Sequence, residues 1–315
     1  MNENGRKIVV VGTGFVGATI SYSLIARNLV NDLVLIDIND QKAHGEAVDI
    51  SHAAPVFGSA KVRAGEYKDV KDSDIIIITA GVNRKPGETR LDLASKNVGI
   101  MKSIVEEIMK YYNGGLFIIV SNPVDVITTM VQKWTGLPAE KIIGSGTSLD
   151  TVRLRQTLYE MYNVDVKNIH ASVIGEHGET QFPYWSGVAI GSVPLKKYPK
   201  TDGTYITDEE MEQIAQDVTK SGAYIIKNKG ATYFGVASAV SEIVDAICGC
   251  RNKIIPVSMV KDELYGMKNV ALSVPRIIGR SGIVADVPIT LTAEEEEKMK
   301  KSAENVYSIV KEFIK

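Results

Sequence analysis

Short apolar runs and amphipathic segments alternate through the first half of the chain. Four runs rich in β-branched residues, "KIVVVG", "DLVLID", "DSDIIIITAG" and "GLFIIVSN", lie at 7–12, 32–37, 72–81 and 115–122. Segments with helical spacing separate them, the clearest being "ATISYSLIARN" at 18–28. Such an alternation is typical of βαβ units, in which helices cover both faces of a parallel sheet. We therefore predict an α/β fold with a doubly wound parallel sheet.

The pattern changes after about residue 145. Long helical segments occupy 207–230 and 237–249, and shorter strand-like stretches such as "NVALSVPRII" follow. The final segment carries one apolar stripe, so we expect its helix to dock on the body. The stripe comprises Met299, Ala303, Val306, Val310 and Phe313. We predict two domains, 1–145 and 146–315, the second a mixed α/β domain packed against the first.

Composition narrows the possible functions. The 315 residues carry a formal net charge of −2, which gives no basic footprint for a nucleic acid. No apolar run approaches the roughly 18 residues of a membrane span, and the polar start "MNENGRK" predicts no signal peptide. Cys248 and Cys250 are too close together to staple the fold and lack metal-ligand spacing, so no metal is predicted. We expect a cytoplasmic protein.

A glycine-rich turn follows the first predicted strand. In "VVVGTGFVGATI", Gly12 suits a tight turn, Gly14 lets the backbone approach a pyrophosphate, and Gly17 allows close packing of helix on strand. The helix that follows offers unpaired N–H groups and the positive end of its dipole. Asp37 ends the second strand about 20 residues later, where a carboxylate binds the ribose of NAD and repels the 2′-phosphate of NADP. The motif predicts NAD as cofactor; glycines that serve packing alone, with Asp37 as a helix cap, are the alternative.

Of the four histidines, His177 is the candidate for proton transfer. It lies in "GEHGE", a glycine-flanked turn directly after a predicted strand. Imidazole accepts and returns a proton near neutral pH. His44 and His52 fall on a predicted helix and are expected at its surface.

The segment "GTSLDTVRLRQ" offers His177 a partner. Asp150 lies at the start of a predicted helix, and Arg153, three residues on, shares its face. Arg155 lies about 200° around the helix axis from Arg153 and should point elsewhere, toward an interface or a second site. An acid and a guanidinium on one face indicate a site, although a simple intrahelical ion pair would explain them equally well.

Together these segments resemble a known family. "GTGFVG", "LVLID", "TAGVNRKPGETRLDL", "SNPVD", "IGSGTSLDTVRLR", "GEHGE" and "KGATYFG" are similar to motifs of the L-lactate/L-malate dehydrogenase family, in its lactate-dehydrogenase-like bacterial branch. The resemblance runs from about residue 6 to the C-terminus. It implies a Rossmann NAD-binding domain, a catalytic and oligomerisation domain, a homotetramer, and reversible hydride transfer between NADH and a 2-keto acid.

The resemblance also implies roles in the reaction. His177 would donate and accept the proton, Asp150 would orient it, and Arg153 would bind the substrate carboxylate through a bidentate contact. Arg90, on a closing loop, would polarise the reacting carbonyl. Two further residues would contact the substrate, Asn122 as a bridge to the cofactor and Thr232 as a wall of the pocket.

Other implied contacts involve the cofactor and an effector. Besides the glycine turn, the positions that would contact NAD are Val16, Asp37, Lys42, Tyr67, Gly81, Asn122 and Ser145. Arg155 and His170 match a pair that binds fructose 1,6-bisphosphate at a subunit interface, which implies an allosteric anion site.

Arg84 bears on the choice of substrate. Family members that act on lactate carry glutamine at this position, and those that act on malate carry arginine. Oxaloacetate brings a second carboxylate for Arg84, whereas pyruvate leaves the guanidinium unpaired, at a cost of roughly 2–5 kcal/mol. Arg84 therefore favours malate dehydrogenase. Lactate dehydrogenase is the alternative, because Thr232 and the Arg155–His170 pair are of the lactate type and Arg84 could point into water.

Two other classes of protein stay open. An NAD-dependent glycosidase can share this fold but needs a metal ligand set in the second domain, where Cys248 and Cys250 have no histidine nearby. A non-catalytic NAD sensor would keep the glycine turn and Asp37. It would have no need of a histidine, an aspartate and two arginines together.

Overall fold

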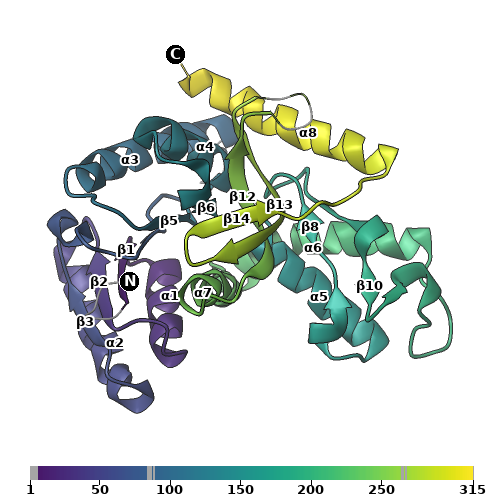
Figure 1. The fold of residues 1–315 in the computed structure, drawn as a ribbon, viewed down its shortest axis with the longest axis horizontal. Helices are drawn as coiled ribbons and strands as arrows, with labels where there is room; N and C mark the ends of the chain where they lie inside the picture. Colours follow the sequence, from purple (N-terminus) through teal and green to yellow (C-terminus); the bar gives the residue numbers. More distant parts are fainter. Residues whose placement is uncertain (1–5, 84–86, 88, 264–265, 267, 315) are drawn as a thin grey trace.

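A computed structural model describes residues 6–83, 87, 89–263, 266 and 268–314. Its central feature is a nine-stranded sheet in the order β14-β13-β12-β6-β5-β4-β1-β2-β3 (Figure 1). The strands of the first half are parallel and follow the order of a doubly wound dinucleotide-binding sheet. They are β1 (Lys7–Val11), β2 (Asp32–Ile36), β3 (Lys61–Ala64), β4 (Ile75–Ile78), β5 (Leu116–Ile119) and β6 (Ile142–Gly144). The predicted Rossmann-type α/β fold is confirmed.

Strand β1 shows why the apolar runs are continuous. Ile8 and Val10 enter the core on one face of the sheet, and Val9 and Val11 enter the core on the other. All four are at most 2% exposed, as expected for a strand covered on both faces. One face is covered by α1 (Phe15–Ala26), α2 (Asp40–Phe57) and α7 (Phe234–Cys248), the other by α3 (Arg90–Met109), α4 (Val124–Thr135) and α8 (Ala293–Val310) (Figure 1).

The second half of the chain extends the same sheet. The antiparallel strands β12 (Lys253–Lys261), β13 (Val270–Gly279) and β14 (Gly282–Asp286) continue it beyond β6, where Ser258 pairs with Gly144. Helix α7 also returns to the first half and packs on α1, where the Ser241 hydroxyl donates to the Ser23 hydroxyl at 2.8 Å. The sheet thus crosses the predicted boundary at residue 145, and the division into two domains stays a prediction.

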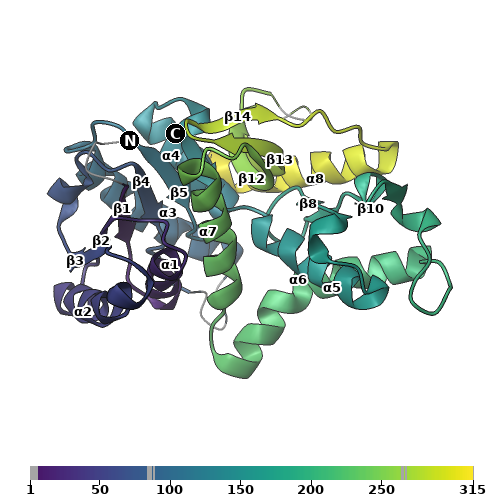
Figure 2. The same cartoon turned by 60° about the horizontal axis from the view of Figure 1, so that its bottom comes forward.

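The rest of the second half forms a smaller body beside α7 (Figure 2). It has its own core, which includes Leu154, Ile169 and Ile214. Its helices are α5 (Ser148–Tyr162) and α6 (Asp208–Lys229), and its strands are β7 (Ile169–His170), β8 (Val173–Ile174), β9 (Phe182–Pro183), β10 (Ala189–Ile190) and β11 (Val193–Pro194). These strands have two residues each, which is why periodicity alone did not predict them.

The C-terminal helix docks as its apolar stripe predicts. Met299, Ala303, Val306 and Val310 on α8 are fully buried against the core that α3 and α4 share. Phe313 follows in a short 3-10 turn and is half-buried on the same core. None of the helices in the described part of the chain is long and apolar enough to cross a membrane.

Candidate active site

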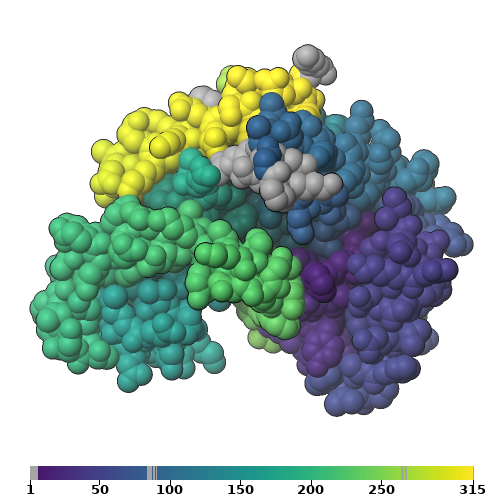
Figure 3. Space-filling model, turned by 180° about the vertical axis from the view of Figure 1, so that it is seen from behind, coloured from purple at the N-terminus to yellow at the C-terminus, as the bar shows by residue number. Residues whose placement is uncertain are grey.

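The residues predicted to hold the cofactor lie at the carboxyl ends of the parallel strands. Gly12 follows β1 directly, Asp37 follows β2, and Ser145 follows β6. Gly81 and Asn122 lie three residues beyond the ends of β4 and β5. In a doubly wound sheet, ligands bind at this edge where the strand order reverses. The surface is hollowed on this side, between the first half in purple and blue and α6 in green (Figure 3).

The three glycines of the turn have different surroundings. A Cβ on Gly12, whose φ is +100°, would lie 2.6 Å from the Ala80 nitrogen, and one on Gly17 would lie 1.9 Å from the Gly12 oxygen. Gly14, in contrast, has nothing within 4 Å of a Cβ. It faces open space before the first turn of α1, which has no side-chain cap. Gly12 and Gly17 therefore serve close packing, and the space at Gly14 fits a pyrophosphate on the free N–H groups of the helix.

The Asp37 carboxylate is held in place by the same turn. Its Oδ2 accepts hydrogen bonds from the Thr13 backbone N–H at 2.6 Å and from the Thr13 hydroxyl at 2.9 Å. Burial by itself would raise the pKa of Asp37, but the N–H groups of Asn39 and Thr13 and the Thr13 hydroxyl bring it below its usual value. The charged carboxylate keeps lone pairs for ribose hydroxyls, so the site fits NAD. Sequence reasoning missed Thr13, the residue between the first two glycines.

Two further positions surround Asp37. Lys42 is exposed on α2, and its charge helps to lower the pKa of Asp37. Tyr67 begins a 3-10 turn, and its pKa is raised by burial and by the charges of Glu107 and Asp37. Val16 is half-buried in the first turn of α1. The structure therefore brings Lys42 and Tyr67 to the edge where the sequence predicts cofactor contacts.

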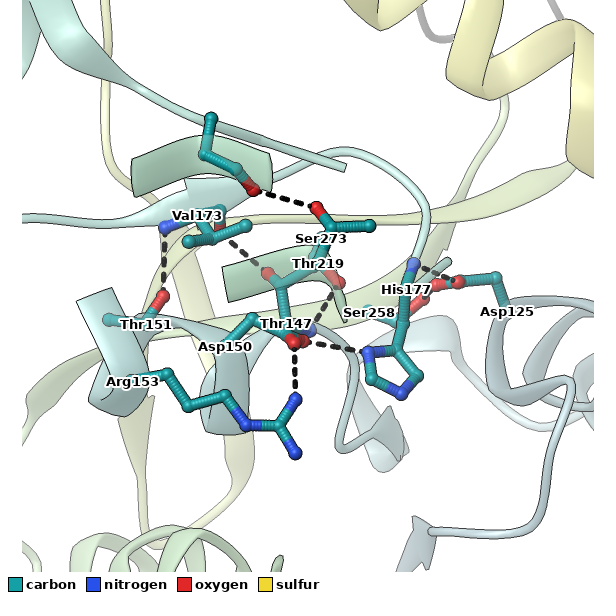
Figure 4. Close-up of polar contacts among 11 residues, drawn as sticks. Asp125, Thr147, Asp150, Thr151, Arg153, Val173, His177, Thr219, Ser258 and Ser273 are labelled. Atoms are coloured by element: carbon teal, nitrogen blue, oxygen red, sulfur yellow. Dashed lines mark hydrogen bonds and ion pairs between the residues drawn. The ribbon is translucent and has the colours of Figure 1, made fainter. Parts of the chain in front are cut away.

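The catalytic candidates meet on the second-half side of this edge. His177 Nδ1 lies 2.7 Å from Asp150 Oδ2, and Arg153 donates to Asp150 Oδ1 at 2.9 Å (Figure 4). The Asp150 side chain is 1% exposed, and that of His177 is 26% exposed. The ion pair on one helix face is thus present, and the same carboxylate also binds the imidazole. The sequence left two explanations open, a functional site and a simple intrahelical ion pair, and each describes part of the arrangement.

The surroundings of His177 and Asp150 shift the pKa values of both residues. Burial would lower the pKa of His177, but the charge and hydrogen bond of Asp150 and the charge of Asp125 raise it above its ordinary value. Burial would raise the pKa of Asp150, but the charge and hydrogen bond of His177 and the charge of Arg153 lower it. Asp150 therefore stays ionised and favours a protonated imidazole. Since Nδ1 is bound to Asp150, Nε2 is the ring atom available for proton exchange.

Buried hydroxyls fix this constellation. The Thr147 hydroxyl donates to the Val173 oxygen at 2.6 Å, and the Thr151 hydroxyl accepts from the Val173 nitrogen at 2.8 Å (Figure 4). These bonds tie α5, which carries Asp150, to β8, which leads into the His177 turn. The Ser273 hydroxyl of β13 also accepts from the Thr147 nitrogen at 3.1 Å. Sequence reasoning did not find these residues, because isolated Ser and Thr carry no periodic signal.

The remaining substrate candidates are partly described. Thr232 lies half-buried just before α7. The backbone oxygen of Asn122 accepts from the Asn97 side chain at 2.7 Å, and the Asn122 residue itself is exposed. Arg90, expected on a loop, is the first residue of α3, and the prediction for its side chain lies outside what the structure describes. Arg84 also lies outside the described residues.

Other candidates lie away from the imidazole pair. The Arg155 Nε donates to the Ala171 oxygen at 3.0 Å. This contact lies next to the exposed His170 of β7, so Arg155 points away from the site of Arg153, as predicted. His44 and His52 are exposed on α2, as expected. Among the described residues, no group of three or more His, Cys, Asp or Glu side chains could hold a metal ion.

A sheet edge that fits a dinucleotide lies beside an imidazole, a carboxylate and a guanidinium that contact one another. Together these features are those of an NAD-dependent oxidoreductase. Residues 6–144 match the model of the lactate/malate dehydrogenase NAD binding domain, and residues 147–315 match that of the lactate/malate dehydrogenase alpha/beta C-terminal domain. The chain belongs to the lactate/malate dehydrogenase family, whose members use NAD to act on a 2-hydroxy acid. The resemblance is confirmed, and the glycosidase and sensor alternatives are set aside.

The similar proteins include several lactate dehydrogenases. The L-lactate dehydrogenase of Thermoanaerobacter pseudethanolicus is 44% identical over 98% of this chain and 99% of its own length. That of Lacticaseibacillus casei is 40% identical over 98% of this chain and 94% of its own length. The solved L-lactate dehydrogenase from Clostridium thermocellum has a TM-score of 0.86 at 44% identity, covering 98% of this chain and 100% of that one. The minor L-lactate dehydrogenase from Enterococcus mundtii gives 0.94 at 34% identity, with 99% of each chain covered.

Proposed function

We propose that this protein is an L-lactate dehydrogenase, which reduces pyruvate reversibly with NADH. The observation that carries the proposal is the identity of 40–44%, over nearly the whole chain, to relatives named L-lactate dehydrogenase. Thr232, a lactate-type residue, agrees with it. The proposal adopts the alternative to the malate preference that Arg84 suggests.

In this proposal His177 moves the proton. Asp150 holds Nδ1, and its charge keeps the imidazole protonated at a pH where free imidazole would be neutral. NADH, when bound, supplies the hydride. Protonated His177 donates to the carbonyl oxygen of the keto acid, and neutral His177 accepts that proton when the hydroxy acid is oxidised.

Arg153 binds the substrate carboxylate. Its Nη1 donates to Asp150 at 2.9 Å, so one carboxylate orients both the guanidinium and the imidazole. The other guanidinium donors are suited to a bidentate contact with a carboxylate. Arg90 stabilises the developing alkoxide, and Asn122 and Thr232 complete the substrate contacts, as the family resemblance implies.

Malate dehydrogenase is the second candidate, and Arg84 is the observation that favours it. A cation on the substrate loop can pair with the far carboxylate of oxaloacetate. Pyruvate would leave it unpaired, and a cost of roughly 2–5 kcal/mol corresponds to about 30-fold to several-thousand-fold in selectivity. A lactate enzyme with Arg84 must keep this guanidinium in water while pyruvate reacts.

Rates with pyruvate and oxaloacetate test the two candidates. NADH absorbance is followed for the natural chain, for Arg84→Gln, and for Lys102→Gln, a control that removes one exposed charge further along α3. The lactate proposal expects a higher kcat/KM for pyruvate and little change in either variant. If oxaloacetate is preferred and only Arg84→Gln moves the preference toward pyruvate, malate replaces lactate.

We also propose a cytoplasmic homotetramer with an anion site for fructose 1,6-bisphosphate. Two observations support this proposal. The motifs resemble those of the lactate-dehydrogenase-like bacterial branch, and Arg155 lies beside the strand that carries the exposed His170. Light scattering and rate assays, each with and without the bisphosphate, test it on the natural chain and on Arg155→Gln. A bisphosphate that alters neither assembly nor rate of the natural chain leaves Arg155 with a structural role only.

A further inference from the structure

An aromatic cluster lies where α6 meets α7, the light green corner beside the purple first half of the chain (Figure 3). Its centre is Tyr233, which directly precedes α7 and follows Thr232, the proposed wall of the substrate pocket. The Tyr233 ring stacks on that of Phe15, with centroids 5.4 Å apart and an angle of 26° between the planes. It also meets the Phe234 ring edge to face, at 4.6 Å. The mechanism above does not use this cluster.

A lysine covers two of these rings. The Lys229 Nζ, from the last turn of α6, lies 3.7 Å from the centroid of the Tyr233 ring and 4.3 Å from that of Phe234. Ring faces attract a cation at such distances. Tyr233 is therefore held by side chains from α6, α7 and α1, and within this cluster Phe15 is the member from the first half of the chain.

Phe15 links the cluster to the position of the cofactor. It follows Gly14, where open space fits a pyrophosphate, and it is the first residue of α1. Its backbone N–H is among the free donors of that helix end, so a bound pyrophosphate would fix the residue on which Tyr233 stacks. Phe15 is 72% exposed, so burial in a core does not explain the position of its ring.

The start of α7 is also fixed from the catalytic side. A Cβ on Gly235 would lie 2.8 Å from Cδ1 of Leu149, the residue before Asp150. The segment that carries Thr232 thus runs between two neighbours, Phe15 at the cofactor edge and Leu149 on α5. Loss of the stack would release this segment from one of the two.

We propose that Tyr233 is a positioning residue, which couples the cofactor turn to the substrate wall at Thr232 through its stack on Phe15. The inference rests on the proposed function, in which Thr232 contacts the keto acid. Occupation of the turn then favours the placement of Thr232 that binds the substrate, and by linkage the two affinities rise together. The stack acts on binding and leaves the proton transfer by His177 unchanged.

Two substitutions remove the stack, one from either side. In Phe15→Leu and in Tyr233→Leu, KM for the keto acid should rise about three- to tenfold, the size of an aromatic pair contact, while kcat stays within about twofold. The double variant should lose no more than the more affected single variant, because both changes remove the same contact. Tyr233→Phe keeps the ring and should show the natural KM. Additive losses, or a fall in kcat with KM unchanged, would overturn the proposal.

Tyr22→Leu is the matched control. Tyr22 lies about two turns further along α1 and pairs edge to face with Phe57 at the end of α2, with centroids 6.1 Å apart. The substitution removes a comparable exposed aromatic pair, so it should change Tm about as much as Phe15→Leu does and leave KM unchanged. An equal rise in KM in both variants would reduce the stack to a stabilising contact.

Hydrogen exchange measures the coupling without turnover, so it stands apart from the proposed function. With saturating NADH, backbone amides at 231–237 of the full chain should exchange about three- to tenfold more slowly in the natural chain and in Tyr22→Leu. In Phe15→Leu this protection should be lost, although fluorescence shows NADH bound. No protection in the natural chain, or equal protection in Phe15→Leu, makes the coupling wrong even where the enzyme reduces pyruvate. If the protein reduces no keto acid but Phe15→Leu loses the protection, the proposed function fails and the coupling stands.

Discussion

The cofactor edge and the His177 cluster are built in different ways. At the cofactor edge, the carboxyl ends of the parallel strands, the site is formed by backbone and by residues without a side chain. Gly12, Gly14 and Gly17 shape the turn, and that turn holds Asp37. The His177 cluster consists of His177, Asp150 and Arg153. Its charged side chains form the site, and buried hydroxyls hold the elements that carry them. The edge should therefore be sensitive to added atoms, and the cluster to removed charge.

The largest expected effect is the loss of catalysis in His177→Asn. Asparagine cannot carry the proton, so keto-acid reduction should fall by about 10²- to 10⁴-fold. NADH fluorescence should show that cofactor binding is retained, since the edge is untouched. Rates close to those of the natural chain would take His177 out of the mechanism, and a joint loss of NADH binding would show that the two regions are not separate.

Next in size is the effect of adding one methyl group to the glycine turn. In Gly17→Ala the new carbon would lie 1.9 Å from the Gly12 oxygen, so we expect a loss of about 1–3 kcal/mol in the free energy of unfolding. Gly14→Ala is the matched variant, with nothing within 4 Å. It should melt near the natural Tm but bind NADH more weakly. Equal stability of the two variants would show that the turn can relax.

A smaller effect should come from pH. Keto-acid reduction needs protonated His177, so its rate should fall about tenfold per unit as pH rises beyond the raised pKa of that residue. The pair also stabilises the fold below the unfolded pKa of histidine, and this contribution is lost as pH rises through the folded value. NADH binding measured over the same range should change little. A rate that stays constant from pH 6 to 10 would contradict the assignment.

The smallest expected effect concerns Asp37→Ala at the edge. Loss of the ribose contact should weaken NADH binding about tenfold, which is the lower end of the roughly 1.5–3 kcal/mol that a hydrogen bond to a charged group is worth. NADPH binding should suffer less, since the repulsion of its 2′-phosphate is removed as well. Fluorescence titration with both nucleotides measures the difference. Equal weakening for both would mean that Asp37 does not select between them.

Local sequence patterns were enough to predict the edge. The glycine turn, the strands on either side and Asp37 lie within one short stretch, and their order determines where they meet. Continuous apolar runs also predicted the parallel sheet, because each strand buries both faces. The same reasoning missed β3, where only two residues of the four, Val62 and Ala64, are apolar.

The cluster could be predicted only in part. Asp150 and Arg153 are one helical turn apart, so their ion pair follows from spacing. His177 lies 27 residues beyond Asp150. The residue types offered Asp150 as its partner, and only the family resemblance implied that Asp150 orients the imidazole. Ser273, whose hydroxyl accepts from the Thr147 N–H, lies 126 residues beyond it, and no period in the sequence connects them. Contacts of this kind depend on how the hairpin joins the sheet, which local patterns do not encode.

The sheet that crosses residue 145 limits how this protein could be divided. A polypeptide that stopped there would leave the outer side of β6 without its partner strand, with N–H and C=O groups ready to pair with another molecule. It would also uncover the side of α1 on which α7 packs. The nucleotide-binding half should therefore not fold well by itself. A chimaeric enzyme that uses this half would also need α7 and the hairpin of β12 and β13.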